Sequence, residues 1–321
     1  MRLFKEEGEE KMKFQIVSDS SCEFTPEDID QCQVSVVSFY VTFGDGASYR
    51  EGKDITAVEF YQRMVDQPDV FPTTSTPTIQ DYLDAFLPLV EAGSPVLCIC
   101  INGQFSSSLQ TAQNARQMIL EDHPQAEIYV MDSRLVTVLQ NQFVREAVRL
   151  RNAGATLAQA VAALEPIRDT GHIFFTTRDL EYLRHGGRIG KAAATAGALL
   201  NVKPLIEYTN CELLSGGIAK GRKQSMKKAI DRCCRHLERT GLDIRDYRVA
   251  TGYGLDREEY LAFTQQVIAA FREMGLEGLR PLGQEFHIGV TIGVHTGPYP
   301  IGLGYLKRAA LPEGCPEPAE V

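Results

Sequence analysis

The stretch PVLCICINGQFSSSLQTAQNARQMIL, residues 95–120, contains the pattern that decides the fold. Residues 95–101 form a continuous apolar run, which is typical of a buried strand. A polar loop follows, and then a segment with the composition of a helix. The same order returns around FQIVSD at 14–19 and EIYVMDS at 127–133. Strands that alternate with helices indicate a largely parallel α/β sheet flanked by helices.

Four helices are expected to begin directly after a threonine that can accept a hydrogen bond from the first helical turn, namely Thr25, Thr56, Thr78 and Thr156. Thr56 and Glu59 also have the spacing of a capping box. Between the helices that follow Thr25 and Thr56, residues 34–43 (VSVVSFYVTF) are expected to form one strand. The segment that follows residue 133 is expected to be an amphipathic helix ending near Arg151.

The second half of the chain has a different pattern, in which two strands follow each other directly. VKPLIEYTNCELLSGGIAK, residues 202–220, is expected to form two strands around a Thr-Asn turn. FHIGVTIGVH at 286–295 is expected to be the final strand. The Ala-rich KAAATAGALLN at 191–201 is expected to be a helix that either packs closely or leaves room for an elongated apolar ligand. A hairpin among single strands implies a mixed sheet in a second α/β domain.

The change of pattern divides the chain into two domains, and the length is compatible with two. We predict an N-terminal α/β domain over 13–170 and a C-terminal α/β domain over 171–310. Residues 1–12 and 311–321 are rich in charge or in Pro and Glu, so we expect them to be disordered tails.

Composition excludes several classes of function. The formal net charge of −9 argues against a protein that wraps nucleic acid. No apolar stretch reaches the ~18 residues of a membrane span, and the first residues lack the apolar segment of a secretory signal. None of the eight cysteines lies in a CxxC pair, so we expect reduced thiols and no metal site. We expect a cytoplasmic protein without a cofactor.

Hydroxyl side chains gather where predicted strands end and helices begin. Thr74 and Ser75 lie in TTSTPT, and Ser106 and Ser107 lie in the SSS segment at 106–108. In open α/β sheets, ligands bind outside the carboxyl ends of the strands, where such hydroxyls could donate to an anion. Helix capping is an equally good explanation, because Ser and Thr commonly start helices.

His295, in IGVHTGP at 292–298, is the one histidine placed directly before a Gly-Pro turn. Taken alone, it is best interpreted as a residue at the end of a strand. A serine hydrolase with Ser106 as nucleophile and His295 as base is formally possible, but no GxSxG elbow or other catalytic motif supports it. Asp19 and Asp132 follow apolar strands without a basic partner, so structural roles are expected for both.

A basic region stands out in the middle of the second half. It includes Arg188 in LRHGGRIG, Lys203, and Arg222 at the start of a predicted helix. It is either a solvated helix face or a docking surface for an acidic or phosphate-bearing partner.

Together, seven segments resemble the DegV family of bacterial fatty-acid-binding proteins, in family order and across residues 13 to about 305. The most specific are the long block that begins LEYLRHGGRIG and the final HTGP. The seven are IVSDSS at 16–21, YREGKDITAVEFY at 49–61, TSTPT at 74–78, FSSSLQTAQNA at 105–115, VMDSRLVT at 130–137, LEYLRHGGRIGKAAATAGALLNVKPLI at 180–206 and IGVHTGP at 292–298.

The resemblance implies a two-domain α/β protein with one long-chain fatty acid bound between the domains. It implies that Thr74, Ser106 and His295 hold the fatty acid carboxylate. Members of the FakB type carry an acyl chain to a separate fatty acid kinase, whose acyl phosphate product enters phospholipid synthesis, and have no catalysis of their own. A kinase subunit would then be a partner, docking at Arg188, Lys203 and Arg222, and transient membrane contact is possible. A lipid-sensing regulator and an acyl hydrolase are the alternatives.

The sequence departs from the family pattern beside the expected carboxylate site. The loop reads NGQFSSS, and the residue after Gly297-Pro298 is Tyr299 in place of the usual glycine. These changes bear on selectivity for the acyl chain, and we expect Tyr299 to narrow the cavity. The residues expected near the site are Ser75, Ser107, Thr296, Gly297 and Tyr299.

Overall fold

The computed structural model describes residues 13–178, 180–195, 202–276 and 285–319. The first half of the chain builds a four-stranded sheet in the order β2-β1-β6-β7, and every neighbouring pair is parallel. This confirms the predicted parallel sheet. Its strands are β1 Gln15–Asp19, β2 Val34–Val37, β6 Val96–Cys100 and β7 Ile128–Asp132.

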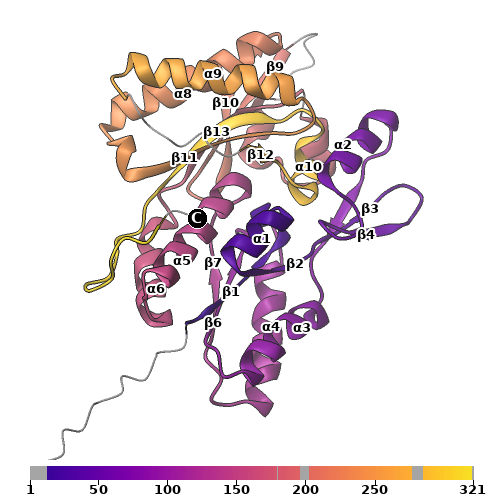
Figure 1. Ribbon diagram of the computed structural model, residues 1–321. Helices are drawn as coiled ribbons and strands as arrows, with labels where there is room; N and C mark the ends of the chain where they lie inside the picture. The colour runs from indigo at the N-terminus through magenta and orange to yellow at the C-terminus, as the bar shows by residue number, and fades with distance from the viewer. Residues whose placement is uncertain (1–12, 179, 196–201, 277–284, 320–321) are drawn as a thin grey trace, which may run out of the picture.

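Four helices of the first half begin as the threonines predict. Each threonine side chain accepts a hydrogen bond from the third residue of its helix, whose own side chain bonds back to the threonine N–H. The helices of this half are α1 Pro26–Cys32, α2 Ala57–Asp66, α3 Ile79–Glu91, α4 Ser108–Asp122, α5 Thr137–Asn152 and α6 Leu157–Leu164, with short 3-10 turns η1 Ser20–Cys22 and η2 Glu165–Ile167. Helices α3, α4 and α5 pack against the four-stranded sheet, whereas α2 lies apart from it near β3 (Tyr40–Thr42) and α10 (Val290–Thr296) (Figure 1).

The single strand predicted over 34–43 is wrong, because the chain changes sheet inside it. β2 ends at Val37, and Val37, Ser38 and Phe39 are buried one after another, which breaks the alternation of a strand with one buried face. The next strand belongs to a separate three-stranded antiparallel sheet of order β4-β3-β5. Its strands are β3 Tyr40–Thr42, β4 Ser48–Arg50 and β5 Thr73–Ser75.

The second half of the chain builds a six-stranded mixed sheet of order β10-β9-β8-β13-β11-β12, as the fold prediction has it. Among the strands that the structure describes here, only β11 and β12 pair in parallel, and β9 and β10 form the predicted hairpin. The strands are β8 His172–Thr176, β9 Val202–Thr209, β10 Glu212–Lys220, β11 Tyr247–Tyr253, β12 Phe286–His287 and β13 Ile301–Lys307.

Helices α8 Arg222–Thr240 and α9 Arg257–Glu273 cover the outer face of this sheet (Figure 1). The shorter elements are α7 Glu181–His185, η3 Gly190–Thr195 and η4 Ile244–Asp246. The helix predicted over 191–201 is therefore a 3-10 helix up to Thr195, and its remainder lies outside the described residues.

The final strand predicted over 286–295 is wrong. Strand β12 is only two residues long, and α10 Val290–Thr296 is a helix. Gly293 lets this helix approach α2, since a Cβ built on it would lie 2.7 Å from both the Phe60 ring and the Tyr61 hydroxyl. Tertiary packing thus overrides the β-branched composition of the segment. The last strand is β13, whose Gly302 and Gly304 hide it from a search for strand periodicity.

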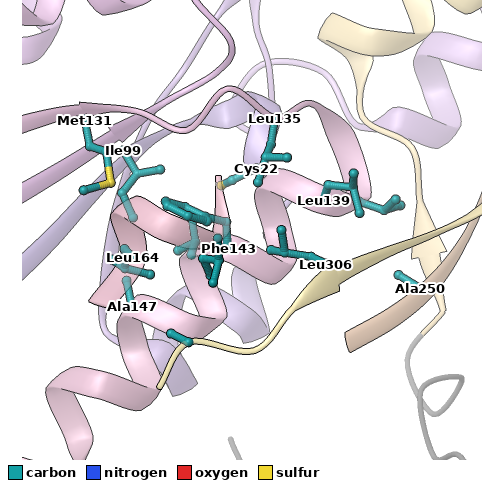
Figure 2. Packing of buried hydrophobic residues seen from close by; sticks show 14 of the residues in the cluster. Cys22, Ile99, Met131, Leu135, Leu139, Phe143, Ala147, Leu164, Ala250 and Leu306 are labelled. Carbon is teal, nitrogen blue, oxygen red and sulfur yellow. The ribbon is translucent and has the colours of Figure 1, made fainter. Parts of the chain in front are cut away.

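Helix α5 lies between the two large sheets and is buried from Thr137 to Arg151, so the predicted amphipathic pattern is wrong. Figure 2 shows Leu139 and Phe143 of this helix directed toward Ile99 of β6 and Leu306 of β13 within one cluster. One hydrophobic core therefore runs through both halves of the molecule.

The domain boundary at 170/171 falls in the turn between η2 and β8 and stays a prediction. The same holds for the disordered tails, of which residues 1–12 lie outside the described part. Beyond residue 310, Leu311 and Cys315 pack against the core, and Glu317 forms ion pairs with Arg149 and Arg308. No described helix is long and apolar enough to cross a bilayer.

Candidate functional site

A largely apolar pocket lies where the carboxyl end of β6 meets α5, α10 and the C-terminal sheet. The empty space within it, open solvent at its mouth included, is about 1020 Å³. Most of its wall is aliphatic or aromatic, which suits an elongated apolar ligand. The apolar lining includes Phe39, Ile101, Phe105, Val136, Val138, Ile173, Phe175, Leu183, Leu213, Ile288, Ile292 and Ile301.

Thr74, Ser106 and His295 all line this pocket, although they come from three distant segments. Thr74 lies in β5, Ser106 in the loop between β6 and α4, and His295 in the last turn of α10. The Thr74 Oγ1 and His295 Nε2 atoms are 3.3 Å apart. The fold thus places two hydroxyls and an imidazole on one pocket wall.

Ser106 and its neighbour Ser107 have different environments. The Ser106 hydroxyl lines the pocket and accepts a hydrogen bond from the Ser108 N–H at 3.2 Å, so it also helps to start α4. Ser107 occupies the N-cap position of α4 without a capping bond. Ser75 and Ser107 are exposed and are not part of the pocket wall. Ser106 thus takes part in the start of α4 and also faces the pocket, whereas its role in ligand binding stays a prediction.

His295 has a low pKa in the empty protein. Burial lowers it to about 4, and the positive charge of Arg188 acts in the same direction. The ring is therefore neutral at pH 7, with one nitrogen as a donor. Its Nδ1 is buried without a hydrogen-bond partner in the described structure, and a Cβ built on Gly186 would lie only 2.1 Å from it. The sequence placed His295 at a strand end, which is wrong, because it lies in a helix.

Thr296, Gly297 and Tyr299 mark a second pocket next to the first. Thr296 lines both pockets, whereas Gly297 and Tyr299 line only the second. The Arg178 guanidinium lies over the Tyr299 ring, 4.1 Å from its centroid. Tyr299 is thus on the far side of Thr296 and not in the wall of the larger apolar pocket that it was expected to narrow.

The three basic residues predicted for partner docking have different environments. Arg188 is exposed, lines the pocket, and donates from Nε to the Phe105 carbonyl at 3.1 Å, next to Ser106. Lys203 donates to the Arg178 carbonyl. Arg222 is already paired with Glu259 at 2.6 Å. Only Arg188 among them lies at the pocket.

Asp19 has the structural role that the sequence suggests. It is fully buried and accepts hydrogen bonds from the Ile101 N–H, from Ser108 and from Gln140. Burial raises its pKa. These bonds fix the end of β1 against the β6–α4 loop that carries Ser106.

Sequence reasoning missed most of the apolar wall. Ile173 and Phe175 of β8 both line the pocket, and their spacing of two is a signal that could have found them. Tyr208, Leu213 and Val138 enter the wall through tertiary packing, for which a local pattern has no signal.

The family model described as an uncharacterised protein of the DegV family matches residues 13–308. This chain belongs to the DegV family. A DegV domain-containing protein of Clostridium perfringens is 30% identical over 305 residues, covering 92% of this chain and 99% of the relative.

DegV-family proteins of known structure share the two-domain α/β fold. A stearic-acid-binding protein from Eubacterium ventriosum is 38% identical with a TM-score of 0.86, covering 92% of this chain and 98% of its own. A DegV-family protein from Thermus thermophilus, described by its fatty acid binding, is 28% identical with a TM-score of 0.78, covering 92% and 100%.

Proposed function

We propose that this DegV-family protein binds one long-chain fatty acid, with the carboxylate at Thr74, Ser106 and His295 and the tail in the apolar pocket. The observation that carries the proposal is the meeting of these three polar side chains on the wall of an otherwise apolar pocket. The Eubacterium ventriosum relative, which binds stearic acid, supports the ligand class.

The energetics of a fatty acid suit such a pocket. A C16 acid has about 14 methylenes, and at ~0.8 kcal/mol each their burial contributes about 11 kcal/mol before the costs of association. A hydrogen bond to a charged carboxylate contributes roughly 1.5–3 kcal/mol. The tail therefore supplies most of the affinity, and the polar residues decide which end of the ligand lies at Thr74.

We further propose that the protein is a carrier without catalysis that offers the carboxylate to a separate fatty acid kinase in the cytoplasm. Arg188 supports this proposal, because it is exposed and lies at the pocket. Arg222 is paired with Glu259, so Arg188 and Lys203 are the better candidates for the docking surface.

The acyl hydrolase is less well supported. No hydrogen bond joins Ser106 to His295 among the described residues, and the His295 Nδ1 atom has no carboxylate to orient it. A nucleophile and base need both contacts to act as a triad.

The test is mass spectrometry of an organic extract of the purified protein. We expect an intact long-chain acid at about one molecule per chain. An extract without lipid, from a protein that hydrolyses acyl esters, would contradict the proposal. Adding a fatty acid kinase with ATP separates the carrier from a lipid-sensing regulator, because only the carrier yields an acyl phosphate.

A further inference from the structure

The helix that carries His295 cannot supply its own first turn with hydrogen-bond acceptors. Helix α10 has only seven residues, and its N-cap is Gly289, which has no side chain to cap with. Isolated helices shorter than about 12 residues are marginal in water. The free N–H groups at its start must therefore be satisfied from elsewhere in the molecule.

Two carboxylates from the N-terminal part of the chain satisfy them. Glu51 accepts the Thr291 N–H at 3.1 Å and the Thr291 hydroxyl at 2.6 Å. Glu23 accepts the Gly289 N–H at 3.0 Å. These partners are 240 and 266 positions apart in the sequence.

Each carboxylate is itself fixed by a hydroxyl from the N-terminal half. Ser20 donates to Glu51 at 2.6 Å, and Thr137 donates to Glu23 at 2.8 Å. Glu51 is buried and Glu23 is half-buried. Gly289 allows the close approach of Glu51, since a Cβ built on Gly289 would lie 2.5 Å from Oε1 of Glu51. Burial raises the pKa of Glu51 and raises that of Glu23 to about 8, so the two carboxyl groups act at the helix start as hydrogen-bond acceptors and not through their charge.

The arrangement connects the two carboxylates to the ligand site through the helix. Thr291 and His295 are one helical turn apart, and both line the pocket. A carboxylate that fixes Thr291 therefore fixes the height and rotation of the His295 ring relative to Thr74.

We propose that Glu51 and Glu23 are positioning residues for the fatty acid carboxylate: they cap α10 from the other half of the molecule and so hold His295 in register with Thr74 and Ser106. This inference rests on the proposed function. Recognition of the carboxylate then needs α10 in place. Binding of the tail relies mainly on the apolar residues of the pocket that lie outside α10.

The test compares a fatty acid with an alcohol of the same chain length. Glu51→Ala should weaken palmitate binding about tenfold or more, the scale of a lost hydrogen bond to a charged group. Hexadecanol binding should change much less, because the alcohol has no carboxylate. Gly289→Ala is a second variant that displaces the same carboxylate by steric contact and should act alike. Glu51→Gln, which keeps an acceptor for the Thr291 N–H, should restore part of the loss.

Hydrogen exchange at residues 290–297 supplies an independent measurement. Protection there should fall in Glu51→Ala and Gly289→Ala, while β13 stays protected. Asp256→Ala is the matched control, because Asp256 caps α9, none of whose residues lines the pocket. It should leave both exchange at α10 and the ratio of palmitate to hexadecanol affinity unchanged.

The outcomes separate the two proposals. Unchanged exchange at α10, or equal losses for palmitate and hexadecanol, would overturn the positioning role. If His295→Ala lowers palmitate affinity but Glu51→Ala and Gly289→Ala do not, only the positioning role fails. A wild-type protein that binds no palmitate would overturn the proposed function and this inference with it.

Discussion

At the scale of the residue, Gly186 decides where the His295 ring can lie. A Cβ at position 186 would lie 2.1 Å from Nδ1, and the backbone there has no unusual conformation that would itself require glycine. The absence of a side chain at Gly186 therefore serves the contact with the imidazole.

Gly186→Ala should displace His295 and weaken palmitate binding about tenfold, the scale of one lost bond to a carboxylate. Gly187→Ala is the control. Gly187 has φ +67 and nothing near its Cβ position, so alanine there should cost about 1 kcal/mol of stability without touching His295. Fluorescent fatty acid displacement and urea unfolding measure the two effects. Equal palmitate affinity in both variants would contradict this role of Gly186.

His295 should also make stability depend on pH. Burial lowers its pKa to about 4 from an ordinary 6.5, so the unfolded chain binds more protons between these values. Its contribution is fully present above pH 6.5 and is lost as the pH falls toward 4. Between pH 7 and pH 5 the empty wild-type protein should lose about 2 kcal/mol more than His295→Ala. His172, with a pKa of about 4 through burial, titrates in both proteins and cancels. Urea unfolding at the two pH values measures this difference. Equal losses of unfolding free energy in the wild-type protein and in His295→Ala would contradict the titration of His295.

At the scale of the element, the sequence predicted helices whose capping groups lie nearby in the chain. It did not predict the helix whose capping groups lie far away in the chain. Thr25, Thr56, Thr78 and Thr156 each lie three residues from the group they bond, so the sequence alone identified four helix starts. Helix α10 has its capping groups 240 and 266 positions away, and its apolar, β-branched sequence therefore resembled a strand. The residues left Thr74 and Ser106 undecided between capping and binding, and only the family resemblance joined them to His295.

Helix α5 offers a test of its buried charges. Glu146 is fully buried and pairs with Arg149 of the same helix and Arg248 of β11. Burial alone would raise its pKa, but Arg248 and Arg149 lower it overall. Glu146→Ala should destabilise the protein by about 3–5 kcal/mol, because Arg248 loses its ion-pair partner in the core and Arg149 keeps only Glu317. The exposed pair Arg50 and Asp54 is the control, and Asp54→Ala should cost about 1 kcal/mol or less. Urea unfolding measures both free energies. Similar losses of stability in Glu146→Ala and Asp54→Ala would contradict the larger role of the buried pair.

At the scale of the whole molecule, the pocket and the core are continuous. Leu183, Val138 and Ile173 belong both to the pocket wall and to the cluster that joins the two halves. A ligand in the pocket therefore contacts the same side chains that hold the halves together. The fold class followed from the order of strands and helices, whereas this continuity depends on side chains from both halves.

Bound fatty acid should accordingly stabilise the whole fold. At a free palmitate concentration of 100 times Kd, the gain is about 2.7 kcal/mol. Delipidated protein should show a higher thermal midpoint as palmitate is added, in one cooperative transition. His295→Ala should need more palmitate for the same shift. Two separate transitions, of which palmitate moves only one, would contradict a shared core.

The order of strands has a consequence for how the protein is made. β13, residues 301–307, comes after both β8 and β11 in the sequence, yet it lies between them in the interior of its sheet. Until those seven residues arrive, β8 and β11 have no partner between them. Helix α10 is also synthesised long after Glu23 and Glu51, which cap it. The pocket wall that Ile173 of β8 and Ile301 of β13 share can therefore form only after β13 has been synthesised.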